Sequence, residues 1–211
     1  YRLLTPGTYS ITARSIGYVS ETVTITISNG SAEVHNFNLS SDPNLENSDI
    51  EGFELGDFSG FEWENLGNEA WVIDGNEFVE GQFSARSGSI GNNEQSILSI
   101  DIDIQEDALV SFYSKISCEP TGSQTGNYYD YLSFQIDGQE QDKWAGESGW
   151  TFREFPIQNG SHTLAWVYTK DQGVTSGQDA VWVDYIVLPS QAGTDIVIGD
   201  INFDGTINIL D

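Results

Sequence analysis

Apolar and polar residues alternate along residues 1–40, which is the pattern of β-strands with one buried face. The stretches TYSITARS and ETVTITIS both follow it, and Asn29-Gly30 predicts a hairpin turn before a third alternating stretch, AEVHNFNLS. The faces expected to be buried carry Tyr9, Ile11 and Ala13, then Val23, Ile25 and Ile27, then His35, Phe37 and Leu39. Three short strands are too few to close a stable core alone, so we expect an incomplete β module here.

Residues 41–49 are polar and contain a proline, which predicts a linker, and residues 50–189 return to strand patterns. Turn pairs such as Asp137-Gly138 separate the segments. The expected strands are EAWVID, QFSARSG, SILSIDIDI, ALVSFYSKIS, DYLSFQID, TFREFPI, HTLAWVYTK and AVWVDYIVL. Short strands at this spacing, without helical periodicity, predict an all-β chain whose main domain is an antiparallel jelly-roll sandwich.

The chain carries 33 acidic residues against 7 lysines and arginines, a formal net charge of −26. This charge repels nucleic-acid phosphates and anionic membranes, and it suits a medium in which salt or calcium neutralises the carboxylates. The apolar fraction of 38% supports a packed core, and no apolar run approaches the roughly 18 residues of a membrane span. Cys118 is the single cysteine, so we expect a small buried apolar residue rather than a disulfide.

The closing stretch GDINFDGTINILD, residues 199–211, has the spacing of an EF-hand-like calcium loop. Gly205 stands where such a loop turns sharply, and oxygen-bearing residues occupy the alternate ligand positions. The expected ligands are Asp200, Asn202, Asp204, Thr206 through its carbonyl, Asn208 and Asp211. The stretch resembles the first half of a type I dockerin, a family with a following helix and a second loop, which implies that residues 190–211 are a linker and an incomplete Ca²⁺ module.

The pattern LLTPGTYSITARSIGY, with the hairpin after it, resembles the carboxypeptidase regulatory-like, transthyretin-like β module. In secreted bacterial zinc carboxypeptidases this module follows the catalytic domain, and one or two earlier strands precede the matching stretch. The resemblance implies that residues 1–40 are part of such a module. It also implies a longer parent protein, which need not be a peptidase.

The stretches GFELGDFSGFEW, GQFSARSGSI and VWVDYIVLP resemble MAM and cleaved-adhesin jelly-roll modules of secreted proteins. In that family a structural calcium ties the first strand to the last. The resemblance implies that Glu54 and Asp184 are ligands of this second calcium. Val183 stands where the family pattern often has another aspartate.

Catalytic motifs are scarce in this sequence. The only histidines, His35 and His162, lie in expected strands without an HxxE or HExxH motif, so the sequence carries no peptidase zinc site. A Cys118–His162 nucleophile pair and a glycosidase carboxylate pair stay open as alternatives, since some of the 33 acidic residues always lie at a suitable separation.

Aromatic residues in loops offer a carbohydrate-binding alternative. Trp166 and Trp182 fall at interior strand positions, where large aromatics fill sandwich cores. Trp144, Trp150 and Tyr128 fall in Gly-rich or polar segments and are the expected ligand contacts.

Taken together, these patterns predict a non-catalytic, calcium-stabilised region of a secreted or cell-surface bacterial protein. Its expected role is adhesion or assembly with other modules or copies of itself, which includes filament formation. The alternatives are an accessory region of a zinc carboxypeptidase and a carbohydrate-binding module. Glycan binding that is lost on substitution of Trp144 or Trp150 favours the last.

Overall fold

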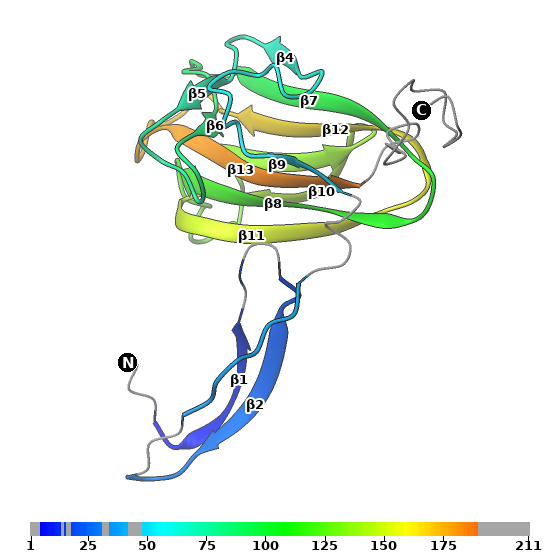
Figure 1. The fold of residues 1–211 in the computed structure, drawn as a ribbon. Coiled ribbons are helices and arrows are strands. Elements are labelled where there is room, and N and C mark those ends of the chain that lie inside the picture. Colours follow the sequence, from blue (N-terminus) through cyan, green and yellow to red (C-terminus); the bar gives the residue numbers. More distant parts are fainter. Residues whose placement is uncertain (1–4, 14, 16–17, 31–33, 42–47, 190–211) are drawn as a thin grey trace, which may run out of the picture. The chain divides into compact units, whose positions relative to one another are not determined.

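The computed structural model describes residues 5–13, 15, 18–30, 34–41 and 48–189. The chain divides into two compact units between Asn47 and Ser48. Every regular element in the described residues is a β-strand (Figure 1), as the alternation of apolar and polar residues predicts. Within those residues, no helix is long and apolar enough to cross a membrane.

The first unit contains an antiparallel pair of strands, β1 (Gly7–Ala13) and β2 (Glu21–Ile27). Tyr9 pairs with Ile25, and every second residue of each strand is partly buried, as predicted. The opposite face is exposed and carries hydroxyl pairs, among them Thr12 and Thr22 with their side-chain oxygens 2.8 Å apart. The first two expected strands are therefore confirmed.

The expected third strand of this unit is wrong over the described residues 34–40, which form no strand. Phe37 and Leu39 are partly buried, as the alternation predicts, but His35, expected on the same face, is exposed. The backbone contacts are too sparse for a ladder, since Val19 N–H donates to the Ser40 carbonyl at 2.9 Å and an isolated bridge joins Tyr18 to Ser41. Alternation marks a half-buried face, but a strand also needs a hydrogen-bonded neighbour.

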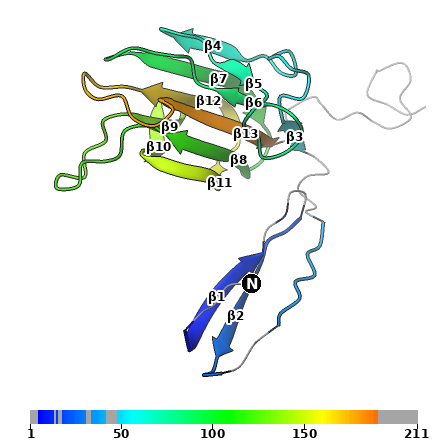
Figure 2. The same cartoon turned by 90° about the vertical axis from the view of Figure 1, so that its left-hand side faces the viewer.

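The second unit is an antiparallel sandwich of two sheets (Figures 1 and 2). One sheet has the order β10-β9-β12-β7-β4, and the other has the order β11-β8-β13-β6-β5, with β3 paired to β13. The strands are β3 (Ser48–Glu51), β4 (Glu64–Gly67), β5 (Val72–Asp74), β6 (Ser84–Arg86), β7 (Gln95–Ile104), β8 (Ala108–Ser117), β9 (Tyr131–Ile136), β10 (Gln139–Trp144), β11 (Glu147–Ile157), β12 (Gly160–Thr169) and β13 (Ala180–Pro189).

All eight expected strands of this unit are present, and the patterns missed β3, β4 and β10. The residues of β4 are all exposed, and β10 exposes most of its polar residues, so neither shows an apolar alternation. The expected turn Asp137-Gly138 joins β9 to β10 with φ values of 53° and 73°. Two positive φ values in succession are typical of a two-residue hairpin turn.

The core lies between the two sheets and is rich in aromatic rings. Phe112 of β8 contacts Phe134 and Trp166 of the other sheet, with ring centroids 5.0 and 5.3 Å away. Trp166 is 0% exposed and belongs to this core, as predicted, whereas Trp182 is 1% exposed but lies outside the core cluster, with Arg86 and Lys115 over its ring. Cys118 is also fully buried, as expected of an apolar residue.

Candidate functional sites

Two acidic residues at the start of the sandwich accept hydrogen bonds from N–H groups around them. Glu51 is 5% exposed, and its carboxylate accepts the Phe53 N–H at 2.6 Å and the Trp63 indole N–H at 3.0 Å. Glu54 lies in the following loop and accepts the N–H of Gln82 at 2.9 Å and that of Phe83 at 3.1 Å. Glu54 thereby holds the loop of residues 79–83.

The last strand holds the same loop through Asp184. This carboxylate is fully buried in β13 and accepts the N–H groups of Val79 at 2.7 Å and Glu80 at 3.3 Å. It also accepts the N–H of Tyr185 at 2.6 Å. Burial raises the pKa of Asp184 to about 6 against the pull of these three donors, and the negative charge of Glu54 raises it further. The structure therefore brings Glu54 and Asp184 to one loop.

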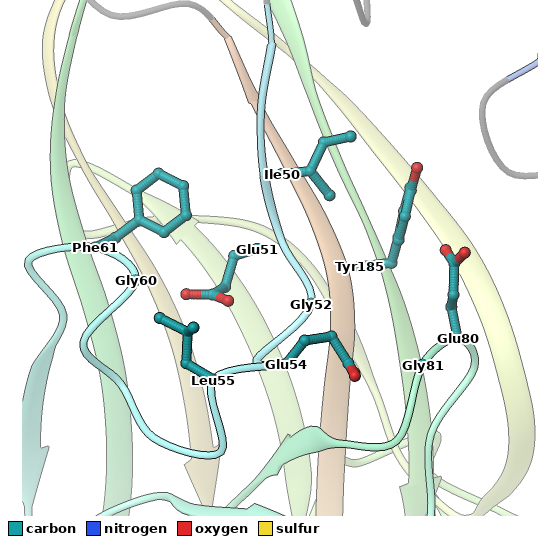
Figure 3. A pocket seen from close by; sticks show the side chains of 10 residues that line it. All are labelled: Ile50, Glu51, Gly52, Glu54, Leu55, Gly60, Phe61, Glu80, Gly81 and Tyr185. Carbon is teal, nitrogen blue, oxygen red and sulfur yellow. The ribbon is translucent and has the colours of Figure 1, made fainter.

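A hollow of about 570 Å³ opens beside this loop. Figure 3 shows the Glu54 side chain extending toward Gly81, while Glu51 points toward Gly60. The lining residues are Ile50, Glu51, Gly52, Glu54, Leu55, Gly60, Phe61, Glu80, Gly81 and Tyr185. Gly81 allows this approach, because a Cβ there would lie 2.1 Å from a Glu54 oxygen.

The fit of a calcium ion to Glu54 and Asp184 is partial. Their carboxylates are the hard oxygen ligands that calcium prefers, and no described salt bridge supplies a cation to either. However, both carboxylates already accept backbone N–H groups, which bring positive rather than negative dipoles to the site. These hydrogen bonds tie both carboxylates to the 79–83 loop, and the first strand of the sandwich, β3, already pairs directly with the last, β13. Calcium at this place stays a prediction.

Two tyrosines and a lysine form a partly exposed group that we call the tyrosine shelf: Tyr128, Tyr131 and Lys143. Tyr128 is 38% exposed, and its ring centroid lies 5.8 Å from that of Tyr131. The Lys143 ammonium lies over both rings, 5.1 and 5.3 Å from their centroids. Tyr131 and Lys143 face away from the core, because their neighbours Leu132 and Trp144 face it. Both strands of the β9-β10 hairpin thus contribute to the tyrosine shelf.

The two candidate tryptophans are less open than Tyr128. Trp144 packs against the core, and the Arg153 guanidinium covers its ring at 4.3 Å. Trp150 is partly buried in β11, where the pairing register shifts between Ser148 and Thr151. Their predicted ligand contacts remain predictions.

One predicted site lies outside the described residues, and the structure shows one cluster that the sequence patterns did not predict. The predicted calcium ligands Asp200, Asn202, Asp204, Thr206, Asn208 and Asp211 lie outside the described residues, so this site stays a prediction. The sequence patterns missed a carboxylate cluster formed by Glu119, Asp130 and Asp171. These three residues come from separate turns without a spacing motif, so no signal in the sequence joins them. The patterns also gave no reason to combine Lys143 with the tyrosines.

No known protein-family profile and no curated protein matches the chain. Solved structures share the fold. The K1 cleaved adhesin domain of Lys-gingipain from Porphyromonas gingivalis is 10% identical over 68% of this chain and 98% of that chain, with a TM-score of 0.50. A CBM61 structure in complex with β-1,4-galactotriose is 14% identical over 65% of this chain and 94% of that one, with a TM-score of 0.46.

The CBM22-1 xylan-binding domain from Paenibacillus barcinonensis is 15% identical over 68% of this chain and 94% of that one, with a TM-score of 0.41. At identities this low, structural likeness speaks to the fold alone. The sandwich of this chain has the antiparallel jelly-roll fold that the sequence predicts, and the K1 adhesin domain shares it.

Proposed function

We propose that the chain is a non-catalytic binding region of an extracellular protein and that its sandwich recognises carbohydrate through the tyrosine shelf. The observation that carries the proposal is the pair of the exposed Tyr128 and the partly exposed Tyr131, with the Lys143 ammonium over both rings. Sugar rings offer apolar C–H faces to aromatic rings, and they offer hydroxyl groups to charged and polar neighbours. A lysine beside two phenols supplies both kinds of contact.

The surroundings of the shelf support this role. Along β9, Ser133 and Gln135 follow Tyr131 on the same outward face, and the Gln135 amide donates to the Ser133 hydroxyl at 3.1 Å. Thr169 pairs with Tyr131 on the neighbouring strand. Gln135 and Thr169 are partly exposed and offer polar groups beside the tyrosines, whereas Ser133 is 1% exposed and supports them from beneath.

Calcium is part of the proposal as a structural ion. The sequence spacing supports one site in residues 199–211, and the shared loop of Glu54 and Asp184 supports a second. The charge of −26 and the fold shared with a cleaved adhesin domain support a secreted or cell-surface setting. A zinc-carboxypeptidase parent rests on the resemblance of residues 1–40 alone.

Adhesion by self-assembly is a second proposal, and a specific observation favours it. In the described residues, β1 and β2 pair only with each other. Strands with an unpaired edge accept an added strand from another molecule. Filaments formed by such contacts need a head-to-tail arrangement of copies.

The carbohydrate proposal is tested by affinity electrophoresis of the whole chain in gels that contain soluble polysaccharides, galactan and xylan among them. We expect retardation by at least one polysaccharide. Loss of one stacked ring costs about 1.5 kcal/mol, so Tyr128→Ala and Tyr131→Ala each weaken the binding about tenfold.

Phe78→Ala is the matched control, because Phe78 is an aromatic residue of similar exposure, 41%, in a different loop. This variant should keep the wild-type affinity. Equal retardation of wild type, Tyr128→Ala and Tyr131→Ala contradicts the proposal, and so does the absence of retardation across the panel.

A further inference from the structure

Three carboxylates meet at one end of the sandwich, away from any motif in the sequence. Glu119 follows β8, Asp130 immediately precedes β9, and Asp171 follows β12. Each offers one oxygen atom, and these atoms lie within 4.8 Å of one another. Ligands on opposite sides of one calcium ion are separated by about 4.6–5.2 Å, since Ca–O distances are about 2.3–2.6 Å. The three oxygens therefore fit around a single ion.

Two of these side chains hold buried oxygens that have no hydrogen-bond partner. Asp130 is 1% exposed, and its Oδ2 has none, while its Oδ1 accepts the Asp171 N–H at 3.1 Å. The Oε2 atom of Glu119 is likewise buried without a partner. A buried carboxylate oxygen is costly to leave unsatisfied. Both side chains belong to the same cluster, so a single ligand satisfies both.

Lys170, whose charge acts on Asp130, is already paired with a carboxylate outside the cluster. Lys170 is 4% exposed, and its ammonium binds the Asp179 carboxylate and the Thr175 hydroxyl. Burial raises the pKa of Asp130, and the charges of Asp179 and Glu119 raise it further, while Lys170 and the Asp171 N–H act in the opposite direction. The balance is an excess of negative charge at a buried position.

We propose that Glu119, Asp130 and Asp171 bind one divalent cation, and that this cation is calcium. All three ligands are hard oxygens, which excludes the soft metals that prefer thiolates. Glu119 and Asp171 are partly exposed, so water can supply further ligands. Ligands on three irregular turns suit the loose coordination of calcium better than the strict octahedron of magnesium.

The ion would fix both ends of the loop between β8 and β9. Glu119 and Asp130 bracket residues 120–129, the segment that carries Tyr128. The Cys118 thiol already holds the base of this loop by donating to the Asp130 carbonyl, with the sulfur 3.3 Å from the oxygen. The metal site does not depend on carbohydrate binding, because its geometry involves neither Tyr128 nor Lys143.

The test is isothermal titration of CaCl₂ alone into the whole chain at neutral pH. The background carries Glu54→Gln, Asp200→Asn and Asp204→Asn, which remove ligands of the other two predicted sites. We expect one-site binding in this background and a calcium-dependent rise in the unfolding temperature. Asp130→Asn and Glu119→Gln should each abolish the binding or weaken it at least tenfold. Glu106→Gln makes the same chemical change at an exposed turn and should leave the binding unchanged.

Two results overturn the proposal: no calcium binding in the background chain, or binding that both Asp130→Asn and Glu119→Gln leave intact. Circular dichroism verifies that each variant is folded. Glu119→Gln, at the partly exposed position, decides the question if Asp130→Asn does not fold.

Discussion

Asp184 is a buried carboxylate whose ionisation opposes folding. Its pKa is about 6 in the folded chain against an ordinary value of 3.8. The folded state therefore binds the Asp184 proton more tightly than the unfolded state does. This tighter binding stabilises the folded chain at low pH, and the stabilisation is lost as the pH rises from about 4 to about 6. A difference of about two pKa units corresponds to about 3 kcal/mol.

The prediction concerns the free energy of unfolding in EDTA, measured with guanidinium at pH 4, 5, 6 and 7. The stability of wild type relative to Asp184→Asn should fall by about 2 kcal/mol across this range, because part of the unfolded-state carboxyl is already ionised at pH 4. Asp57→Asn is the control of opposite sign, because N–H and hydroxyl donors from Ser59 lower the pKa of Asp57. A pH-independent difference for Asp184→Asn refutes the assignment. If calcium binds beside Asp184, added CaCl₂ should reduce the fall.

At the scale of single residues, the sequence predicted the pair Glu54 and Asp184 but missed the carboxylate cluster. Glu54 and Asp184 stand in stretches that resemble a known module, and the structure brings both to the 79–83 loop. Glu119, Asp130 and Asp171 are neighbours only because three strands end at the same side of the sandwich. The pairing of β9 with β12 and the packing of the other sheet, which contains β8, place them together, and no local spacing encodes either.

Two glycines, one in the turn between β9 and β10 and one at the end of β4, test how much of the stability depends on backbone conformation. Gly138 has a φ of +73° with nothing within 4 Å of an added Cβ, while Gly67 has a φ of +95° and its Cβ would lie 2.3 Å from the Gln95 carbonyl. We expect Gly138→Ala to cost about 1 kcal/mol, since only backbone strain is added. Gly67→Ala should cost about 3 kcal/mol, because a backbone clash accompanies the strain.

Denaturant unfolding of both variants measures the difference. Equal costs would falsify the claim that the close approach of Gly67 to β7 matters beyond its φ angle. Gly30→Ala, with a φ of +75° and open space around its Cβ, belongs to the first unit and should leave the transition of the sandwich unchanged.

Strands with one buried face were predictable, and strands without one were not. β7 and β12 alternate buried and more exposed residues over most of their length, which is the signal that the apolar pattern carries. β4 lies at a sheet edge with every residue exposed, so only its pairing to β7 defines it. Residues 34–40 show the converse, an alternating pattern without a partner strand.

The whole chain combines two units with a net charge of −26. Self-repulsion opposes association of such chains unless cations neutralise the contacts. If the chain assembles through β1, β2 or residues 199–211, calcium should promote the assembly more than an equal ionic strength of NaCl. Light scattering coupled to size exclusion measures the mass in CaCl₂, NaCl and EDTA. A monomer under all three conditions excludes assembly through these segments, and Asp204→Asn separates the closing loop from β1 and β2.

The positions of the tryptophans give this two-unit chain a built-in spectroscopic division. All six indoles belong to the second unit, and Trp71, Trp166 and Trp182 are at most 2% exposed there. Intrinsic tryptophan emission therefore reports the melting of the sandwich, whereas the hairpin of β1 and β2 contributes to the far-ultraviolet dichroism without contributing to that emission. The difference between the melting curve from tryptophan emission and the melting curve from far-ultraviolet dichroism measures how far the hairpin unfolds on its own, without any added label.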